Sequence, residues 1–135
     1  MDVHIQSREG AEQLGSAILL AALDDLMVTE YSLEPGMEPG DPHYHADHSD
    51  SFYVLEGELE FQIDGRSVRA GAGTLVAAPR GAVHAFPVAI GSRARFLNLH
   101  TPGGFEVYLR ELNQMRSRGE KPGAEFLQSH DIFDV

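Results

Sequence analysis

The sequence predicts a mostly β protein, an antiparallel sandwich or small barrel, followed by a C-terminal helix. Short apolar runs come at close, even spacing between residues 52 and 100, with turn signals between them. Asp64-Gly65, which separates two of these runs, is typical of a tight β-hairpin. After residues 101–104, Thr-Pro-Gly-Gly, apolar residues recur every three or four positions, which indicates a helix.

The N-terminal part is expected to form a hairpin. Residues 18–23 and 26–33 are rich in apolar and β-branched residues, and Asp24-Asp25 separates them. A helix over residues 11–23 is the competing interpretation, because alanine favours helices. Gly15 interrupts that short run, so we favour strands. Residues 35–42, with three prolines and two glycines, then form a turn-rich approach to His43.

The central strands and the helix follow from the same patterns. Strands are expected at residues 52–55, 59–63, 67–70, 74–78, 83–88 and 94–100. The helical stripe consists of Phe105, Tyr108, Leu109, Leu112 and Met115, and we expect it to pack on the outside of the β structure as core rather than to line a pocket. Gly119 and Pro122 end this helix, and residues 124–130 add one more turn.

Composition restricts the class of protein. The chain has 135 residues, enough for a single domain with one sizeable core. Its net charge of −11 argues against a nucleic acid or an anionic membrane as partner. The longest apolar candidate, residues 17–23, is far too short to span a bilayer. Residues 1–5 lack the features of a signal peptide, so we expect a cytoplasmic location.

Three histidines and one aspartate have the spacing of a metal site. His43 and His45 are two residues apart, so in a strand they point to the same face. Asp50 follows a short polar turn and opens the next apolar run, from which it can face the pair. His84 follows the breaker Pro79-Arg80-Gly81, and antiparallel packing can bring it opposite the first two. Any one of these histidines alone would be an ordinary surface residue.

The ligand types indicate the kind of metal. Imidazole and carboxylate ligands suit divalent Fe, Mn, Ni, Cu or Zn, and the chain contains no cysteine that would indicate a thiolate site. The residues leave the choice among these five metals open. We therefore expect a divalent transition metal as cofactor.

These residues resemble the two motifs of the cupins, small β-barrels of the jelly-roll type. The first motif corresponds to His43-X-His45-X4-Asp50-X6-Gly57 and the second to Gly73-X5-Pro79-X-Gly81-X2-His84-X3-Val88. The resemblance implies a single cupin domain over residues 1–135, with a barrel core at about 26–100 and a helical cover at 103–130. It is nearest to small, quercetin-dioxygenase-like cupins, and it implies that His43, His45, Asp50 and His84 bind the metal.

The chain departs from the family pattern at several positions. The leading glycine, Gly36, lies six residues before His43 instead of five, which a loop can absorb. Asp50 replaces the family's glutamate, so at an unchanged backbone its oxygen would fall about one bond length short of a metal contact. Val88 replaces an asparagine that is more often structural. His48 has no fixed role in the family; it is a candidate spare ligand or acid/base, although a solvated loop position is the simpler expectation.

Alternation along the strands predicts the pocket. If Asp50 faces inward, so do Phe52 and Val54, and the strand of His84 then turns Phe86 inward. A partner strand supplies Phe61 and Ile63 in one register. Phe52, Val54, Phe61 and Phe86 are therefore the candidate substrate pocket, an apolar cup suited to a small hydrophobic molecule. The alternative is that these side chains only fill a tight barrel.

Three functions are compatible with such a site. An oxygenase would use a metal with open positions on a small hydrophobic, enolic or aromatic substrate. A non-redox isomerase or polyketide-cyclase-like enzyme would use the metal as a Lewis acid. The third is a non-catalytic cupin that binds a ligand or a metal. Tyr44 and His48 are the candidate catalytic residues, with Tyr31, His100 and Glu30 as further proton carriers. The family resemblance also implies a homodimer, paired through a strand such as residues 18–23.

Overall fold

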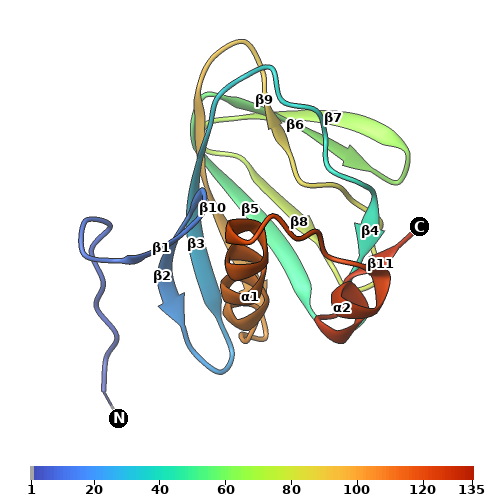
Figure 1. Cartoon of the computed structure of the whole chain (residues 1–135). Coiled ribbons are helices and arrows are strands. Elements are labelled where there is room, and N and C mark those ends of the chain that lie inside the picture. The colour runs from blue at the N-terminus through green and yellow to red at the C-terminus, as the bar shows by residue number, and fades with distance from the viewer. Residues whose placement is uncertain (1) are drawn as a thin grey trace.

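The computed structural model describes residues 2–135 and consists mainly of antiparallel β structure (Figure 1). The elements in chain order are β1 (Glu12–Leu14), β2 (Ala17–Ala22), β3 (Met27–Leu33), β4 (His43–Tyr44), β5 (Ser49–Glu56), β6 (Glu58–Ile63), β7 (Arg66–Gly71), β8 (Leu75–Ala78), β9 (Val88–Ala89), β10 (Ala94–Thr101), α1 (Glu106–Ser117), α2 (Ala124–Ser129) and β11 (Phe133–Asp134).

The strands form three sheets that stay separate rather than closing into one barrel. The largest has the order β1-β2-β3-β10-β5-β8, a second has the order β7-β6-β9, and β11 pairs with β4. The sheet of β6 leans over the large sheet, and α1 lies in front of the open side between them (Figure 1). This arrangement is a jelly roll with helices over its open side, and it confirms the fold that the family resemblance implied.

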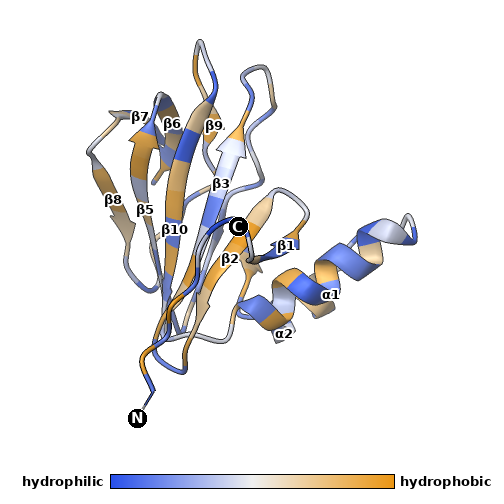
Figure 2. Ribbon diagram, turned by 90° about the vertical axis from the view of Figure 1, so that its left-hand side faces the viewer, coloured by the Kyte–Doolittle hydropathy of each residue, from blue (hydrophilic) through white to orange (hydrophobic). Residues whose placement is uncertain are grey.

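Alternation along β5 and β10 divides the interior into an apolar end and a polar end. Every second residue of β10 is buried, and its ribbon carries both polar and apolar bands in Figure 2. The two strands are antiparallel neighbours, and His100 lies opposite Asp50, whereas Phe96 lies opposite Val54. Phe96 and Val54 are fully buried in the hydrophobic core. The buried polar side chains of these strands therefore lie where β5 begins and β10 ends.

The expected N-terminal hairpin is confirmed. β2 and β3 pair in antiparallel fashion, with Ala17 opposite Tyr31 and Ala22 opposite Met27. The helical alternative for residues 11–23 is wrong, because those residues form β1 and β2 around a turn in which Gly15 has a φ of 63°. A dimer contact through residues 18–23 stays a prediction.

The expected strand over residues 83–88 is wrong for most of its length. His84 makes isolated antiparallel bridges to His43 and Ile63, and regular pairing resumes at β9. Pro87 has no backbone N–H, so it cannot donate to a continuous ladder through this segment. The short pairing nevertheless holds His84 directly against His43.

The C-terminal elements cover the open side of the sheets. α1 and α2 match the helical pattern, and no helix in residues 2–135 has the length and apolar character needed to cross a membrane. The stripe on α1 differs from expectation in its contacts, because Phe105, Tyr108, Leu109 and Leu112 line a cavity. A helical stripe identifies the buried face of a helix but not what that face covers.

Candidate metal centre

His43 and His84 are placed opposite each other by backbone hydrogen bonds. His43 N–H donates to His84 O and His84 N–H donates to His43 O, each over 2.9 Å. On its other side β4 pairs with β11, where Asp134 lies opposite His43. The two imidazole rings lie 4.7 Å apart between centroids. The backbone pairing of His43 with His84 thus fixes the first pair of candidate ligands.

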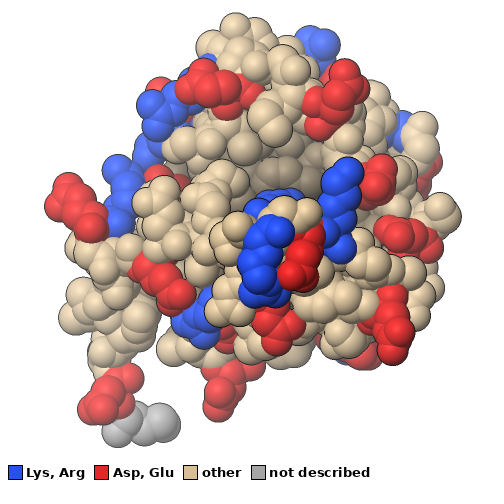
Figure 3. Space-filling view, viewed as in Figure 1, with Lys and Arg blue, Asp and Glu red and all other residues tan. Residues whose placement is uncertain are grey.

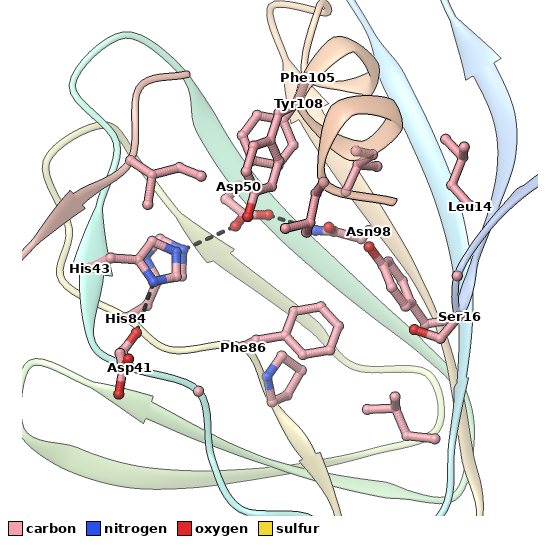
Figure 4. Close-up of a pocket in the computed structure, with 18 of the residues that line it drawn as sticks. Leu14, Ser16, Asp41, His43, Asp50, His84, Phe86, Asn98, Phe105 and Tyr108 are labelled. Atoms are coloured by element: carbon pink, nitrogen blue, oxygen red, sulfur yellow. Dashed lines mark hydrogen bonds and ion pairs between the residues drawn. The ribbon is translucent and has the colours of Figure 1, made fainter. Parts of the chain in front are cut away.

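The structure brings the four sequence-predicted ligands together. One ligand atom from each of His43, His45, Asp50 and His84 lies within 4.8 Å of the others. Asp50 Oδ2 is 3.0 Å from His84 Nε2 and 3.4 Å from His45 Nε2. Figure 4 shows Asp50 between the histidines His43 and His84 on one side and Asn98 on the other. The shorter side chain of Asp50 therefore does reach the histidine cluster.

The outer nitrogen of each candidate histidine ligand donates to a backbone carbonyl. Nδ1 of His43 lies 3.0 Å from Asp41 O, that of His45 lies 2.7 Å from Asp131 O, and that of His84 lies 2.9 Å from Ala82 O. Because a carbonyl only accepts, each Nδ1 carries the proton, and in the neutral ring Nε2 keeps its lone pair. His45 Nε2 is buried and lacks a hydrogen-bond partner in residues 2–135.

This arrangement fits a transition metal ion. Nitrogen lone pairs converge on one carboxylate, and outer hydrogen bonds of this kind orient the histidine ligands of metal sites. An unsatisfied, buried ring nitrogen would be costly unless something binds to it. His43, His45, His84 and Asp50 are the residues that would hold the metal.

Asp50 stays ionised despite its burial. Burial opposes the charge, but the neighbouring His100, together with His45 and His84, holds the pKa of Asp50 well below its usual value. Burial lowers the pKa of His84, but the hydrogen bond to Asp50 outweighs it, so the pKa of His84 is raised. The cluster therefore contains a buried negative charge, which attracts a cation.

A second layer of polar residues surrounds Asp50. Asn98 Nδ2 donates to Asp50 Oδ1 over 2.6 Å, and His100 Nε2 lies 3.2 Å from the same oxygen. Both side chains come from the inward face of β10. The sequence interpretation did not include Asn98, and it named His100 only as a proton carrier. Asn98 and His100 lie two and four residues after the apolar Phe96, so alternation along the strand could have placed them on the same inward face.

A cavity of about 480 Å³ opens beside the candidate metal ligands. His43, His45, Asp50 and His84 line it, and its walls are mainly apolar and aromatic, with Tyr31, Leu33, Phe86, Phe105, Tyr108 and Leu109. The space-filling view shows the hollow near the centre of the molecule, with charged side chains at its rim (Figure 3). Arg116, Glu38 and Asp41 are among the charged residues that line it.

The predicted pocket residues are divided between cavity and core. Phe86 lines the cavity, whereas Phe52, Val54 and Phe61 lie in the hydrophobic core and are at most 2% exposed. They do face inward, but into the hydrophobic core rather than into the cavity. The alternative interpretation, that these three residues fill the barrel, describes their position.

The two candidate catalytic residues lie away from the cavity lining. Tyr44 stacks on Phe133, with 5.2 Å between ring centroids. His48 is buried rather than solvated, and its Nδ1 lies 2.8 Å from Asp131 Oδ2. Burial lowers the pKa of His48 even though Asp131 acts in the opposite direction. The solvated position expected for His48 is therefore wrong, because a partner 83 residues away covers it.

Comparison with known proteins agrees with this geometry. The family model described as "Cupin domain" matches residues 29–100, more than half of the chain. The chain belongs to the cupin family. The matched segment contains all four candidate metal ligands as well as Asn98 and His100, whereas α1, α2 and β11 lie outside it.

Individual relatives of this cupin are more distant. Quercetin 2,3-dioxygenase of Bacillus subtilis (strain 168) is 30% identical over 70 residues, which cover 52% of this chain and 20% of that protein. The chain thus spans about one fifth of the length of this curated relative.

Solved structures with a similar fold include KdgF from Halomonas sp., with a TM-score of 0.66 and 22% identity over 79% of this chain and 99% of that one. An RmlC-like cupin from Shewanella frigidimarina NCIMB 400 also has a TM-score of 0.66, with 23% identity over 78% of this chain and 96% of that one. At this level of identity the solved structures support the fold.

Proposed function

We propose that this cupin binds one divalent transition metal ion through His43, His45, Asp50 and His84 and acts as an oxygenase on a small hydrophobic or enolic substrate. The observation that carries the proposal is the common orientation of the three histidines. Each donates its Nδ1 proton to a carbonyl, so that the Nε2 atoms are left to face the cluster around the buried carboxylate of Asp50.

The metal, when bound, supplies open coordination positions for oxygen and for an oxygen-donor substrate. The chain's own residues orient the imidazole rings, keep Asp50 ionised and provide apolar walls to the cavity beside the cluster. The similarity to quercetin 2,3-dioxygenase supports oxygenase chemistry over a non-redox reaction.

The cavity walls support the substrate class. Tyr31, Phe86 and Phe105 present aromatic surface beside the metal ligands, which suits a small apolar molecule. Burial raises the pKa of Tyr31 and of Tyr108, so both hydroxyls stay protonated at neutral pH. Protonated hydroxyls can donate hydrogen bonds to an oxygen of the substrate.

The first test is the metal content of the purified, tag-free protein, measured by plasma mass spectrometry for the wild type, His84→Ala and the control His4→Ala. His4 is exposed and lies outside the ligand cluster. We expect about one equivalent of metal in the wild type and the control, and loss of it in His84→Ala. No metal in the wild type, either as purified or after reconstitution, would contradict the proposal.

The second test measures oxygen consumption by the metal-loaded protein with an oxygen electrode, with quercetin as the first probe and simple enols as further probes. Oxygen uptake that depends on both metal and probe supports the oxygenase. Zinc as the bound metal, with turnover of an enol under anaerobic conditions, would contradict the oxygenase and favour a metal-dependent isomerase or cyclase.

A further inference from the structure

Asp131, far from the metal ligands in sequence, contacts the loop that joins two of them. It follows His130, the C-cap of α2, and has a left-handed backbone, with φ of 63°. Its carbonyl and carboxylate oxygens accept four hydrogen bonds, all from residues 45–48, and its backbone N–H donates to Gln128 O. This loop connects His45 to Asp50, so its conformation decides how these two side chains meet.

The backbone carbonyl of Asp131 fixes the ring of His45. His45 Nδ1 donates to it over 2.7 Å, the shortest of the three ring-to-carbonyl bonds made by the candidate ligands. This bond selects the tautomer whose Nε2 lone pair faces Asp50 and the centre of the cluster. Without it, the ring is free to protonate at Nε2 instead.

The carboxylate of Asp131 fixes the turn after His45. Oδ1 accepts the backbone N–H of Ala46 over 2.7 Å, and Oδ2 accepts both the N–H of Asp47 over 2.8 Å and Nδ1 of His48 over 2.8 Å. Two oxygens thus satisfy three donors. The hydrogen bonds to Asp47 and Ala46 contribute to a lowered pKa of this carboxyl, although burial opposes it, so it is ionised.

We propose that Asp131 is a positioning residue of the metal centre, which sets the tautomer of His45 and the conformation of the turn that leads to Asp50. The inference rests on the proposed metal site and adds to it a residue outside the segment that matches the cupin family. The C-terminal segment is in this way part of the site rather than only a cover over it.

Both properties of the residue are needed at this position. A left-handed backbone is tolerated by Asn, Asp and Gly. Of these, only Asp offers two acceptor oxygens without a donor. In asparagine one of the two oxygens is replaced by an NH₂ group, which is a donor. That group would face either the N–H of Ala46 or the donors of Asp47 and His48, because each oxygen of Asp131 accepts at least one hydrogen bond.

The test compares Asp131→Asn and Asp131→Gly with Asp64→Asn and Asp64→Gly. Asp64 is a matched control, since it too has a positive φ, of 49°, and its carboxylate makes no hydrogen bond or ion pair within residues 2–135. Cobalt(II) affinity is measured by competition with a chelator, together with the cobalt absorption spectrum. We expect about 10- to 100-fold weaker binding for both Asp131 variants and changes below about twofold for both Asp64 variants.

A second readout needs no metal. In nitrogen-15 NMR of the histidine rings of the metal-free wild type, we expect His45 and His48 as Nδ1–H tautomers. In Asp131→Asn we expect His48 to become a mixture of tautomers and the Nδ1 proton of His45 to exchange with water at least about tenfold faster. Unfolding of the metal-free proteins by urea shows whether each variant is folded.

The outcomes separate this inference from the proposed function. If the wild type binds cobalt and folded Asp131→Asn binds it equally well, the positioning role is wrong while the metal site stands. If the wild type binds no metal, the proposed function fails, and unchanged tautomers and exchange in Asp131→Asn would overturn the positioning role as well. If Asp131→Gly does not fold, Asp131→Asn, which keeps the backbone conformation, decides.

Discussion

Asn98 donates a hydrogen bond to the carboxylate of Asp50, with Nδ2 2.6 Å from Oδ1, and a second to the backbone carbonyl of Ser51 over 2.9 Å. Its amide thereby binds one oxygen of Asp50 to the inward face of β10 and leaves Oδ2 for His84 and His45. A neighbouring strand thus orients the carboxylate, whose side chain is one methylene shorter than that of the family's glutamate.

Asn98→Ala is expected to weaken metal binding by about 10- to 100-fold, because a supporting hydrogen bond to the ligand is lost. It should also lower the free energy of unfolding of the metal-free protein by about 1–3 kcal/mol, since a buried carboxylate loses a donor. Cobalt titration and urea unfolding check both effects. Asn113→Ala, at the exposed rim of the cavity, is the control. Equal affinity in wild type and Asn98→Ala would contradict the role of Asn98.

Substitution of two phenylalanines should distinguish a core position from a position at the cavity. Phe52 is 2% exposed and packs against Phe61 and Phe96, so Phe52→Ala should lower the free energy of unfolding by about 3–5 kcal/mol. Phe86 is half-buried and borders an existing cavity, so Phe86→Ala should cost less than half as much. Urea unfolding of both variants gives the comparison. Equal losses would contradict the placement of Phe86 at the cavity.

Local patterns were sufficient to predict most strands and the ligand cluster. Alternation and turns act over a few residues, so β5, β6, β7 and β10 follow directly from them. The candidate ligands could be predicted for the same reason. Each of His43, His45, Asp50 and His84 lies at the edge of such a run.

Contacts between distant segments explain what the sequence did not predict. His48 is bound by Asp131 and packs against Phe105, both distant in sequence, and the face of α1 lines a cavity. Neither contact is visible within a window of a few residues. The depth of Phe52 and Phe61 in the barrel depends on where the two sheets meet, whereas alternation reports only which way a side chain points.

Gly57, at the end of the first cupin motif, should be the more sensitive of two turn glycines. It has φ of 79°, and an added Cβ would lie 2.5 Å from Arg93 O, whereas Gly65, with φ of 76°, has open space at the same point. Gly65→Ala should therefore cost only the left-handed backbone, about 1–2 kcal/mol. Gly57→Ala should cost clearly more, because the backbone at Arg93 must move. Thermal and urea unfolding test the order, which a similar loss in both variants would contradict.

The metal-free protein should lose stability as the pH falls from about 6.5 to about 4. Burial lowers the pKa of His100 from 6.5 to about 4, so in this range the unfolded chain binds a proton that the folded protein does not. Burial acts in the same direction on the pKa of His43 and of His48. His84 opposes them, because its raised pKa gives stability that is present below pH 6.5 and lost as the pH rises through the folded value. The contribution of His100 is about 3 kcal/mol over the whole range.

Urea unfolding of chelator-treated protein between pH 4.5 and pH 7.5 measures this dependence, in a range above the usual pKa of Asp50 of 3.8. His100→Gln removes the titrating ring and should flatten the slope of stability against pH relative to the wild type. His130→Gln, at the C-cap of α2 and paired with Glu111 of α1, is the control and should keep the wild-type slope. Equal slopes for His100→Gln and the wild type would show that His100 does not carry the dependence, whereas a flattened slope would place a neutral imidazole beside Asp50 in the metal-free protein.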